Sequence, residues 1–180
     1  MNWIREGEGS LELSDKTLYK GEFKKDLPNG KGIKTFPDGS EYTGEFTNGQ
    51  FNGYGTFKWS DGTIYDGHWE NNKIQGKGTH TMSDGTSLTG HFIGKKTITG
   101  EGIKVWVKGN KSYVYKGAIA NGSISERGVF EFPDGRVYSG DCVDGLMQGS
   151  GKYTWSDPHL GIITYTGGFL QNNFHVSVYR

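Results

Sequence analysis

Apolar residues and glycines alternate with polar residues in two neighbouring segments, residues 42–46 and 55–59. A period of two is the spacing at which side chains share one face of a β-strand, so both segments are predicted to be strands. Asp61-Gly62 follows the second segment and predicts a two-residue type I′ turn, in which both central residues have positive φ. Residues 48–53 carry two Asn-Gly pairs and turn the chain back the other way. The pattern therefore predicts antiparallel hairpins joined in a meander.

The same pattern recurs along the whole chain. A Tyr-x-Gly-x-aromatic start returns at a step of 23 residues, which lengthens to 27 at two places. The first residues of these starts are Tyr19, Tyr42, Tyr65, Leu88, Tyr115, Tyr138 and Tyr165. Full repeats are therefore predicted to begin at residues 19, 42, 65, 88, 115 and 138. Residues 1–18 match the second half of a repeat and residues 165–180 form a closing half repeat or cap, so residues 1–180 are predicted to be one repeat domain.

Each repeat places its large side chains on one face of the predicted sheet. Tyr42 and Phe46 flank Gly44, and Trp59 returns on the next strand, where it can lie over the notch that the glycine leaves. The positions between them are mostly polar, as expected where one face of an antiparallel sheet meets water. The fold class predicted is all-β, a single-layer antiparallel meander of repeated β-hairpins. About fourteen strands at about 4.8 Å each make an elongated sheet of about 65 Å. Its radius of gyration should exceed the roughly 16 Å of a compact chain of this length.

Composition supports a folded chain rather than a disordered one. Glycine accounts for 31 of 180 residues and apolar residues for only 32%, but aromatic residues reach 14% and the glycines are periodic. No apolar run approaches the roughly 20 residues that span a bilayer, and residues 1–6 do not resemble a signal peptide. The single cysteine, Cys142, cannot form an intrachain disulfide. These features predict a cytoplasmic protein.

Motifs for catalysis or metal binding are absent from the sequence. It has no Gly-x-Ser-x-Gly elbow, no phosphate-binding loop and no His-Glu-x-x-His pair. His68 and His91 occupy equivalent positions in successive repeats, about 9–10 Å apart across two strand spacings, which is too far for one zinc ion. The repeated Asp-Gly pairs lack the further acidic positions of a calcium loop, so they are interpreted as turns. We expect no enzyme activity, no metal and no cofactor.

Tyr-x-Gly-x-Phe followed by Gly-x-Gly and then Asp-Gly, at a step of 23, resembles the MORN (membrane occupation and recognition nexus) repeat. The resemblance covers residues 7–180. It implies a long, twisted, single-layer sheet with an aromatic groove. It also implies a scaffold or adaptor that binds protein segments and, in some members, lipids or membranes. The sequence departs from the pattern at several positions, among them Leu88, Ile119, Glu126 and Cys142.

The aromatic face has two interpretations. Buried aromatics stabilise by roughly 1.5–3 kcal/mol each and could simply form the core. However, the sequence offers no second layer to cover them, so part of the face is predicted to be a groove for a protein segment. The groove residues predicted are Tyr42, Phe46, Trp59, Tyr65, Trp69, Phe92 and Trp106. A quaternary ammonium ligand held between aromatics is a further alternative, which the absence of a signal peptide disfavours.

Net charge is zero, but the lysines are clustered. Residues 16–34 and residues 95–116 each hold six lysines, and an acidic block lies between them. The second hypothesis is therefore a phospholipid-binding module in which Lys95, Lys96, Lys104 and Lys108 contact anionic lipid, with the protein associated with a membrane or the cytoskeleton. Nucleic acid is not expected as a partner because no continuous basic stripe is present.

The last predicted strand, residues 174–179, alternates apolar and polar residues and carries neither proline nor lysine. An unprotected edge strand exposes backbone donors and acceptors to another strand. The sequence therefore predicts edge pairing, with a two-fold homodimer as the simplest form.

Overall fold

The computed structural model describes residues 4–94 and 98–175. These residues form fifteen antiparallel strands in one open sheet, whose order follows the sequence from first to last. The all-β meander predicted from the sequence is confirmed, with one strand more than estimated.

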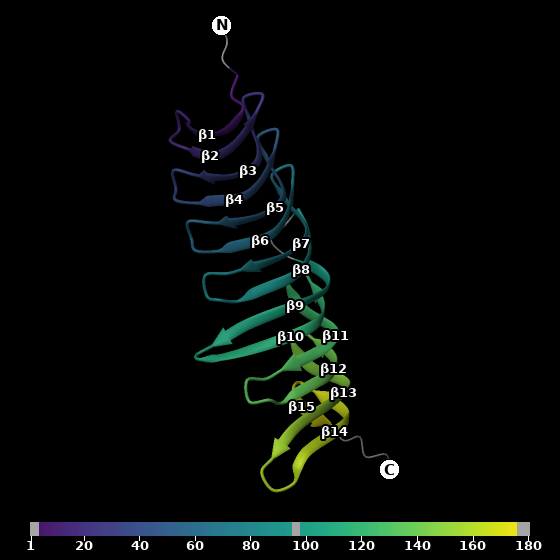
Figure 1. Ribbon diagram of the computed structural model, residues 1–180. Coiled ribbons are helices and arrows are strands. Elements are labelled where there is room, and N and C mark those ends of the chain that lie inside the picture. The colour runs from purple at the N-terminus through teal and green to yellow at the C-terminus, as the bar shows by residue number, and fades with distance from the viewer. Residues whose placement is uncertain (1–3, 95–97, 176–180) are drawn as a thin grey trace. The chain divides into compact units, whose positions relative to one another are not determined.

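The chain divides into two compact units. Unit 1 comprises Met1–Ser83 and Phe92–Lys96, and unit 2 comprises Asp84–His91 and Thr97–Arg180. The strands (Figure 1) are β1 (Gly7–Glu12), β2 (Leu18–Lys24), β3 (Leu27–Thr35), β4 (Glu41–Thr47), β5 (Gln50–Lys58), β6 (Ile64–Glu70), β7 (Lys73–Thr81), β8 (Ser87–Ile93), β9 (Ile98–Lys108), β10 (Lys111–Ala120), β11 (Ser123–Glu131), β12 (Val137–Val143), β13 (Leu146–Asp157), β14 (Gly161–Leu170) and β15 (Asn173–His175).

The two-residue turns lie at the connections equivalent to Asn48-Gly49. Asn48 and Gly49 have φ of +50° and +81° and join β4 directly to β5. Paired positive φ values recur at residues 25–26, 71–72, 121–122, 144–145 and 171–172. Left-handed φ at both central positions is the signature of the type I′ turn, and asparagine, aspartate and glycine tolerate it best.

The turn at Asp61-Gly62 differs from the prediction. Residues 59–63 separate β5 from β6, and Gly62 has φ of +85°, whereas Asp61 has no positive φ. The Gly62 N–H donates to the Trp59 carbonyl at 3.0 Å. The Asp61 carboxylate accepts the Thr63 N–H at 2.9 Å. The type I′ prediction is wrong at this turn because the aspartate side chain, and not a second left-handed residue, closes it.

Each bulged hairpin changes register just after its strand glycine. Strands β4 and β5 pair Gly44 with Gly55 and then Phe46 with Phe51, so one residue of β4 faces three of β5. Gly53 lies in this bulge with φ of +71°. The same shift occurs between β2 and β3, β6 and β7, β10 and β11, and β12 and β13. Because a bulge bends the strand that carries it, each of these hairpins is bent at the same place.

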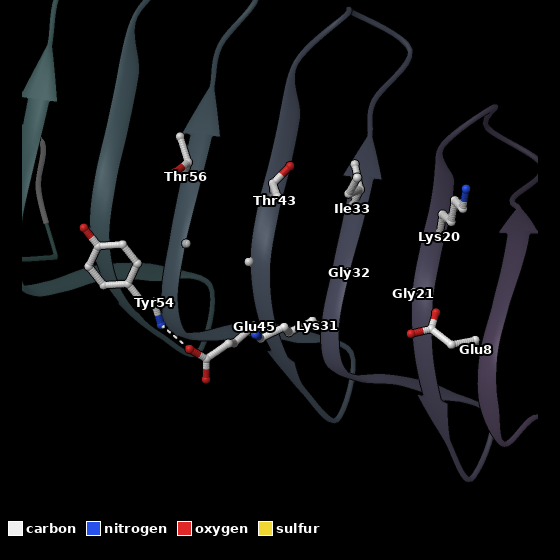
Figure 2. Close-up of a pocket in the computed structure, with 12 residues that line it drawn as sticks. Glu8, Lys20, Gly21, Lys31, Gly32, Ile33, Thr43, Glu45, Tyr54 and Thr56 are labelled. Atoms are coloured by element: carbon white, nitrogen blue, oxygen red, sulfur yellow. Dashed lines mark hydrogen bonds between the residues drawn. The ribbon is translucent and has the colours of Figure 1, made fainter.

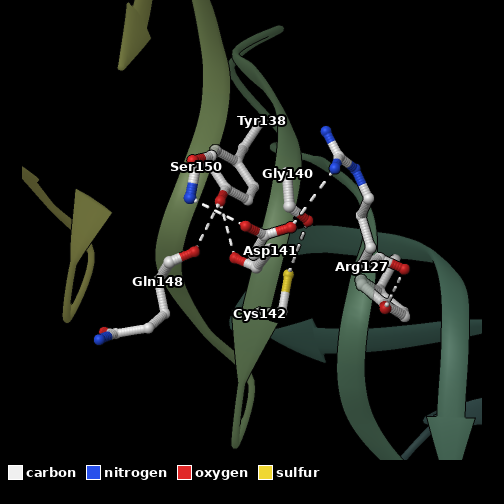
Figure 3. A network of polar contacts seen from close by, with 8 residues as sticks. Arg127, Tyr138, Gly140, Asp141, Cys142, Gln148 and Ser150 are labelled. Atoms are coloured by element: carbon white, nitrogen blue, oxygen red, sulfur yellow. Dashed lines mark hydrogen bonds and ion pairs between the residues drawn. The ribbon is translucent and has the colours of Figure 1, made fainter. Parts of the chain in front are cut away.

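A carboxylate on the polar face holds the bulge. Asp141 accepts the Ser150 N–H at 2.9 Å, and its second oxygen lies 3.5 Å from the Arg127 guanidinium (Figure 3). The equivalent Glu22 and Glu45 accept backbone N–H groups at 2.8 and 3.2 Å. The sequence suggested only solvated polar side chains at this position, but they pair backbone groups that the register shift leaves without strand partners.

On the other face, a tyrosine lies over the facing glycines of every full repeat except the one that begins at Leu88, where Ile98 fills the space beside Gly90 and Gly102. Tyr42 is 0% exposed, and its hydroxyl donates to the Glu45 carbonyl at 3.0 Å. A Cβ on Gly44 would lie 2.7 Å from that hydroxyl oxygen, and one on Gly55 would lie 2.5 Å from the ring Cζ. The same bond, to the carbonyl three residues further on, is made by Tyr19, Tyr65, Tyr115, Tyr138 and Tyr165. Glycine is therefore required on both strands by the space that the ring occupies.

Candidate functional site

Most of the predicted groove residues form the core. Tyr42, Phe46, Tyr65, Trp69 and Phe92 are at most 6% exposed. Their rings join successive repeats, because each tyrosine packs against the aromatic residue of the next repeat. The Tyr42–Trp69 and Tyr65–Phe92 centroids lie 5.5 and 5.2 Å apart. A partner could reach these rings only by displacing them, so the expectation that they line an open groove is corrected to a role in packing.

The two remaining predicted groove residues are half-buried. Trp59 lies in unit 1, with its ring 4.5 Å from that of Phe57 and 5.9 Å from that of His80. Trp106 lies in unit 2 and stacks on Tyr113, with centroids 5.5 Å apart and planes 11° apart. Of the two, Trp106 lines a cavity.

Unit 2 carries a continuous row of rings, which we call the aromatic track. Its members are Trp106, Tyr113, Phe132, Tyr153, Trp155 and Phe174. Successive centroids from Trp106 through Tyr113 and Phe132 to Tyr153 lie 5.5, 6.4 and 6.0 Å apart. Tyr153 then lies 5.6 Å from Phe174 and 5.9 Å from Trp155. Four members, Trp106, Tyr113, Phe132 and Trp155, are half-buried, Tyr153 is buried and Phe174 is 51% exposed.

Two adjoining cavities follow the aromatic track. The first, of about 430 Å³, is lined by the rings from Trp106 to Tyr153 together with Lys108, Arg136 and Met147. The second, of about 340 Å³, is lined by Tyr153, Trp155 and Phe174. Arg136, Met147, Tyr153 and Asn172 line both. Concave sites lined by aromatic side chains together with a few polar groups are the usual form of a ligand-binding site.

The polar groups at the aromatic track are cationic or neutral. The Arg136 guanidinium lies 5.1 Å from the Phe132 ring centroid, and its Nε donates to both carboxylate oxygens of Asp134 at 2.9 and 2.8 Å. This bond holds the pKa of Asp134 below its usual value and raises the pKa of Arg136. Among the described residues that line the two cavities there is no carboxylate. A cationic ligand is therefore disfavoured, because protein cations already occupy the rim.

Sequence reasoning placed Trp106, Phe132 and Trp155 in one column of large residues and Phe174 in another apolar column, but it missed Tyr113 and Tyr153. Tyr153 lies two residues after the second glycine of Gly-x-Gly, in a column that also holds Phe57 and Phe130 and could have been noticed. Tyr113 lies in residues 110–114, an insertion in the repeat that begins at Leu88, so the other repeats offer no equivalent residue. One apolar residue per repeat recurs just after the Asn-Gly turn or its equivalent, and the sequence suggests that these residues line a loop edge of the sheet, but the structure places all of them in strands: Phe51, Ile74, Ile98, Ile124, Met147 and Phe174. All of them except Phe174 are buried.

The lysines predicted to contact lipid do not form one described surface. Lys95 and Lys96 lie outside the described residues. Lys104 is half-buried, and its Nζ donates to the Gly122 carbonyl at 3.1 Å. Lys108 is exposed at the rim of the first cavity.

The polar face of unit 1 bears a shallow trough of about 580 Å³ (Figure 2). Its lining includes four strand glycines, Gly21, Gly32, Gly44 and Gly55. Lys20, Ile33, Thr43 and Thr56 lie on one side of the trough, and Glu8, Lys31, Glu45 and Tyr54 lie on the other. Lysines and glutamates are interspersed along it, so the trough has no preference for one sign of charge. Glu45 already accepts the Tyr54 N–H.

Within residues 4–94 and 98–175, no cluster of three histidine, cysteine or acidic side chains could hold a metal ion. The same residues contain no helix long and apolar enough to cross a membrane. Cys142 is 2% exposed, and burial raises the pKa of its thiol to about 11. Of the predicted dimer edge, Asn173–His175 forms β15, and residues 176–179 lie outside the described part.

Repeated hairpins, most of them with a tyrosine packed on a pair of facing glycines, define a β-repeat protein. The model of the MORN repeat matches residues 19–41, 42–64, 65–87, 115–135 and 138–157, more than half of the chain. The chain belongs to the MORN repeat family. Repeats of this family typically act as protein-binding or membrane-binding modules, in proteins associated with membranes or the cytoskeleton. No curated protein matches the chain at a significant level.

Proposed function

We propose that this protein is a non-enzymatic adaptor that holds a segment of a protein partner along the aromatic track of unit 2. The observation that carries the proposal is the run of half-buried rings beside two adjoining cavities. The ring spacings from Trp106 to Tyr153 correspond to at most about five residues of extended chain at about 3.3 Å each. An adaptor of this kind would act in the cytoplasm, as the sequence predicts.

Partially buried tryptophan and tyrosine are the residues that most often dominate binding energy. Trp106 is the best anchor because it lines the cavity while its other face is supported by Tyr113. Trp59, proposed from the sequence as the central anchor, lies in unit 1 and is not a member of the aromatic track, so it serves as the matched control.

The test selects peptides from a random twelve-residue display library on the immobilised full chain and measures their affinities in solution. Trp106→Ala should weaken the selected peptides by at least about 30-fold, equivalent to about 2 kcal/mol. Trp59→Ala should leave them within about twofold. Circular dichroism and thermal melting establish that both variants fold. Full affinity in a folded Trp106→Ala variant would exclude this site.

A parallel assay measures binding to phosphatidylserine vesicles at low and high salt and tests the lipid hypothesis. The lipid hypothesis predicts vesicle binding that falls steeply with salt and on reversing the charges of Lys95, Lys96, Lys104 and Lys108. If this is observed and no selected peptide depends on Trp106, lipid binding replaces the peptide proposal. Absence of vesicle binding at low salt would eliminate the lipid hypothesis.

A further inference from the structure

We infer that the segment received by the aromatic track is acidic, with carboxylates placed beside an aromatic or aliphatic side chain. The inference rests on the proposed function and adds the chemistry of the partner. Its basis is the sign of charge at the rim, the geometry of Arg136 and the difference between this repeat and the others.

Arg136 is specific to one repeat. The residue after Asp-Gly is Ser40, Thr63 or Thr86 in other repeats, and in each of them its N–H donates to the aspartate two residues earlier. Arg136 keeps that turn bond, to Asp134 at 3.2 Å, and adds a guanidinium over the cavity. The turn therefore does not need arginine, and the long side chain has another use.

The guanidinium is oriented for a carboxylate. Both side-chain bonds to Asp134 use Nε, so Asp134 does not engage the two Nη groups. The guanidinium carbon lies over the Phe132 ring, 5.1 Å from its centroid, which restrains the position of the group. A planar guanidinium held in this way receives a carboxylate through paired, charge-assisted hydrogen bonds.

The surroundings add positive charge and apolar contact. Lys108 lines the same cavity, and the half-buried Lys104 precedes it on β9. Trp106, Phe132 and Met147 provide the apolar wall. An acidic segment with one large apolar side chain satisfies both features, whereas a basic segment would bring its charges against Lys108 and Arg136.

Three variants test the inference on peptides from the same selection. Arg136→Thr restores the residue type of the other repeats and so preserves the turn. Lys108→Glu reverses the second rim charge. Lys152→Glu is the matched control, because Lys152 is exposed and next to Tyr153 in β13, and therefore on the opposite face of the sheet.

Selected peptides should be enriched in aspartate and glutamate beside an aromatic or aliphatic residue. Arg136→Thr should weaken them at least about tenfold, the equivalent of one charge-assisted hydrogen bond. Lys108→Glu should also weaken them, and Lys152→Glu should leave them unchanged.

Each other outcome overturns the inference in a distinct way. If the selected peptides need Trp106 but show no acidic bias, or if their affinity is unchanged by both Arg136→Thr and Lys108→Glu, the acidic partner is overturned. The proposed function is not affected by that result. If no peptide needs Trp106, both fail. Binding of single-stranded DNA or phosphatidylserine vesicles that depends on Arg136, without any acidic peptide, would assign the rim to phosphate and overturn the peptide occupant.

Discussion

Replacing Gly55 with alanine should destabilise unit 1 by steric conflict alone. Gly55 has no positive φ, so the backbone accepts alanine without strain. The new Cβ would lie 2.5 and 2.7 Å from the Cζ and Cε2 atoms of Tyr42, although carbon atoms normally approach no closer than about 3.5 Å. The Tyr42 ring would have to move by about 1 Å, and its position is fixed by stacking on Phe51 at 3.8 Å and by the hydrogen bond to Glu45.

The size of the effect follows from three contributions. Overpacking a buried site costs about 1–3 kcal/mol, and loss of the tyrosine hydrogen bond costs about 1 kcal/mol. Replacing a glycine also reduces the conformational entropy of the unfolded chain, which stabilises the folded state by about 0.4–1 kcal/mol. The expected net loss in the free energy of unfolding is therefore about 2 kcal/mol.

Urea denaturation followed by circular dichroism measures this loss. Gly9→Ala is the graded control in the same unit, because its Cβ would meet Phe23 at an only slightly tight 3.3 Å. It should change stability by less than about 1 kcal/mol. Tyr42→Leu, which copies the residue at Leu88, should remove most of the cost of Gly55→Ala in the double variant. A Gly55→Ala protein as stable as the parent, or a Gly9→Ala protein equally damaged, would refute the steric explanation.

Three other predictions concern stability. Glu126 has φ of +55° at a position where other repeats use glycine. Glu126→Gly should therefore raise the free energy of unfolding by about 1 kcal/mol, measured as a higher urea midpoint. A lower midpoint would show that the strain is absent. Asp141→Ala should cost about 1 kcal/mol because the Ser150 N–H loses its acceptor, while Asp141→Asn should cost less; equal costs would assign the loss to something other than this bond. Burial raises the pKa of Tyr19, Tyr65, Tyr115 and Tyr138 to about 12. Unfolded tyrosines titrate near pH 10, so the unfolded state loses protons first and stability should fall as the pH rises from about 10 to about 12. Absorbance at 295 nm and circular dichroism should then change together, and titration of these phenols near pH 10 in the folded protein would contradict the burial argument.

The sequence by itself determined the β-hairpin repeat and its phase. Alternation with a period of two fixes which residues share a face, and glycine recurs at the same places in the repeats. The ring that fills the space beside Gly44 and Gly55 is Tyr42, however, and not Trp59 as the sequence suggested. This information is local, because Tyr42 and Gly44 belong to one strand and Gly55 to its neighbour. A single repeat therefore carries the pattern.

Only the tertiary structure decided which aromatics are core and which are accessible. Tyr42 and Trp106 both read as large residues on the apolar face, but the bulge brings Phe51 over Tyr42 and the next repeat adds Trp69. Whether a ring is covered depends on the bend of the hairpin and on the neighbouring repeat, and neither is encoded in the alternation itself. The same holds for Arg136, which reads as one residue after a turn and becomes part of a cavity wall only when β9, β10 and β13 bring Trp106, Tyr113 and Tyr153 beside it.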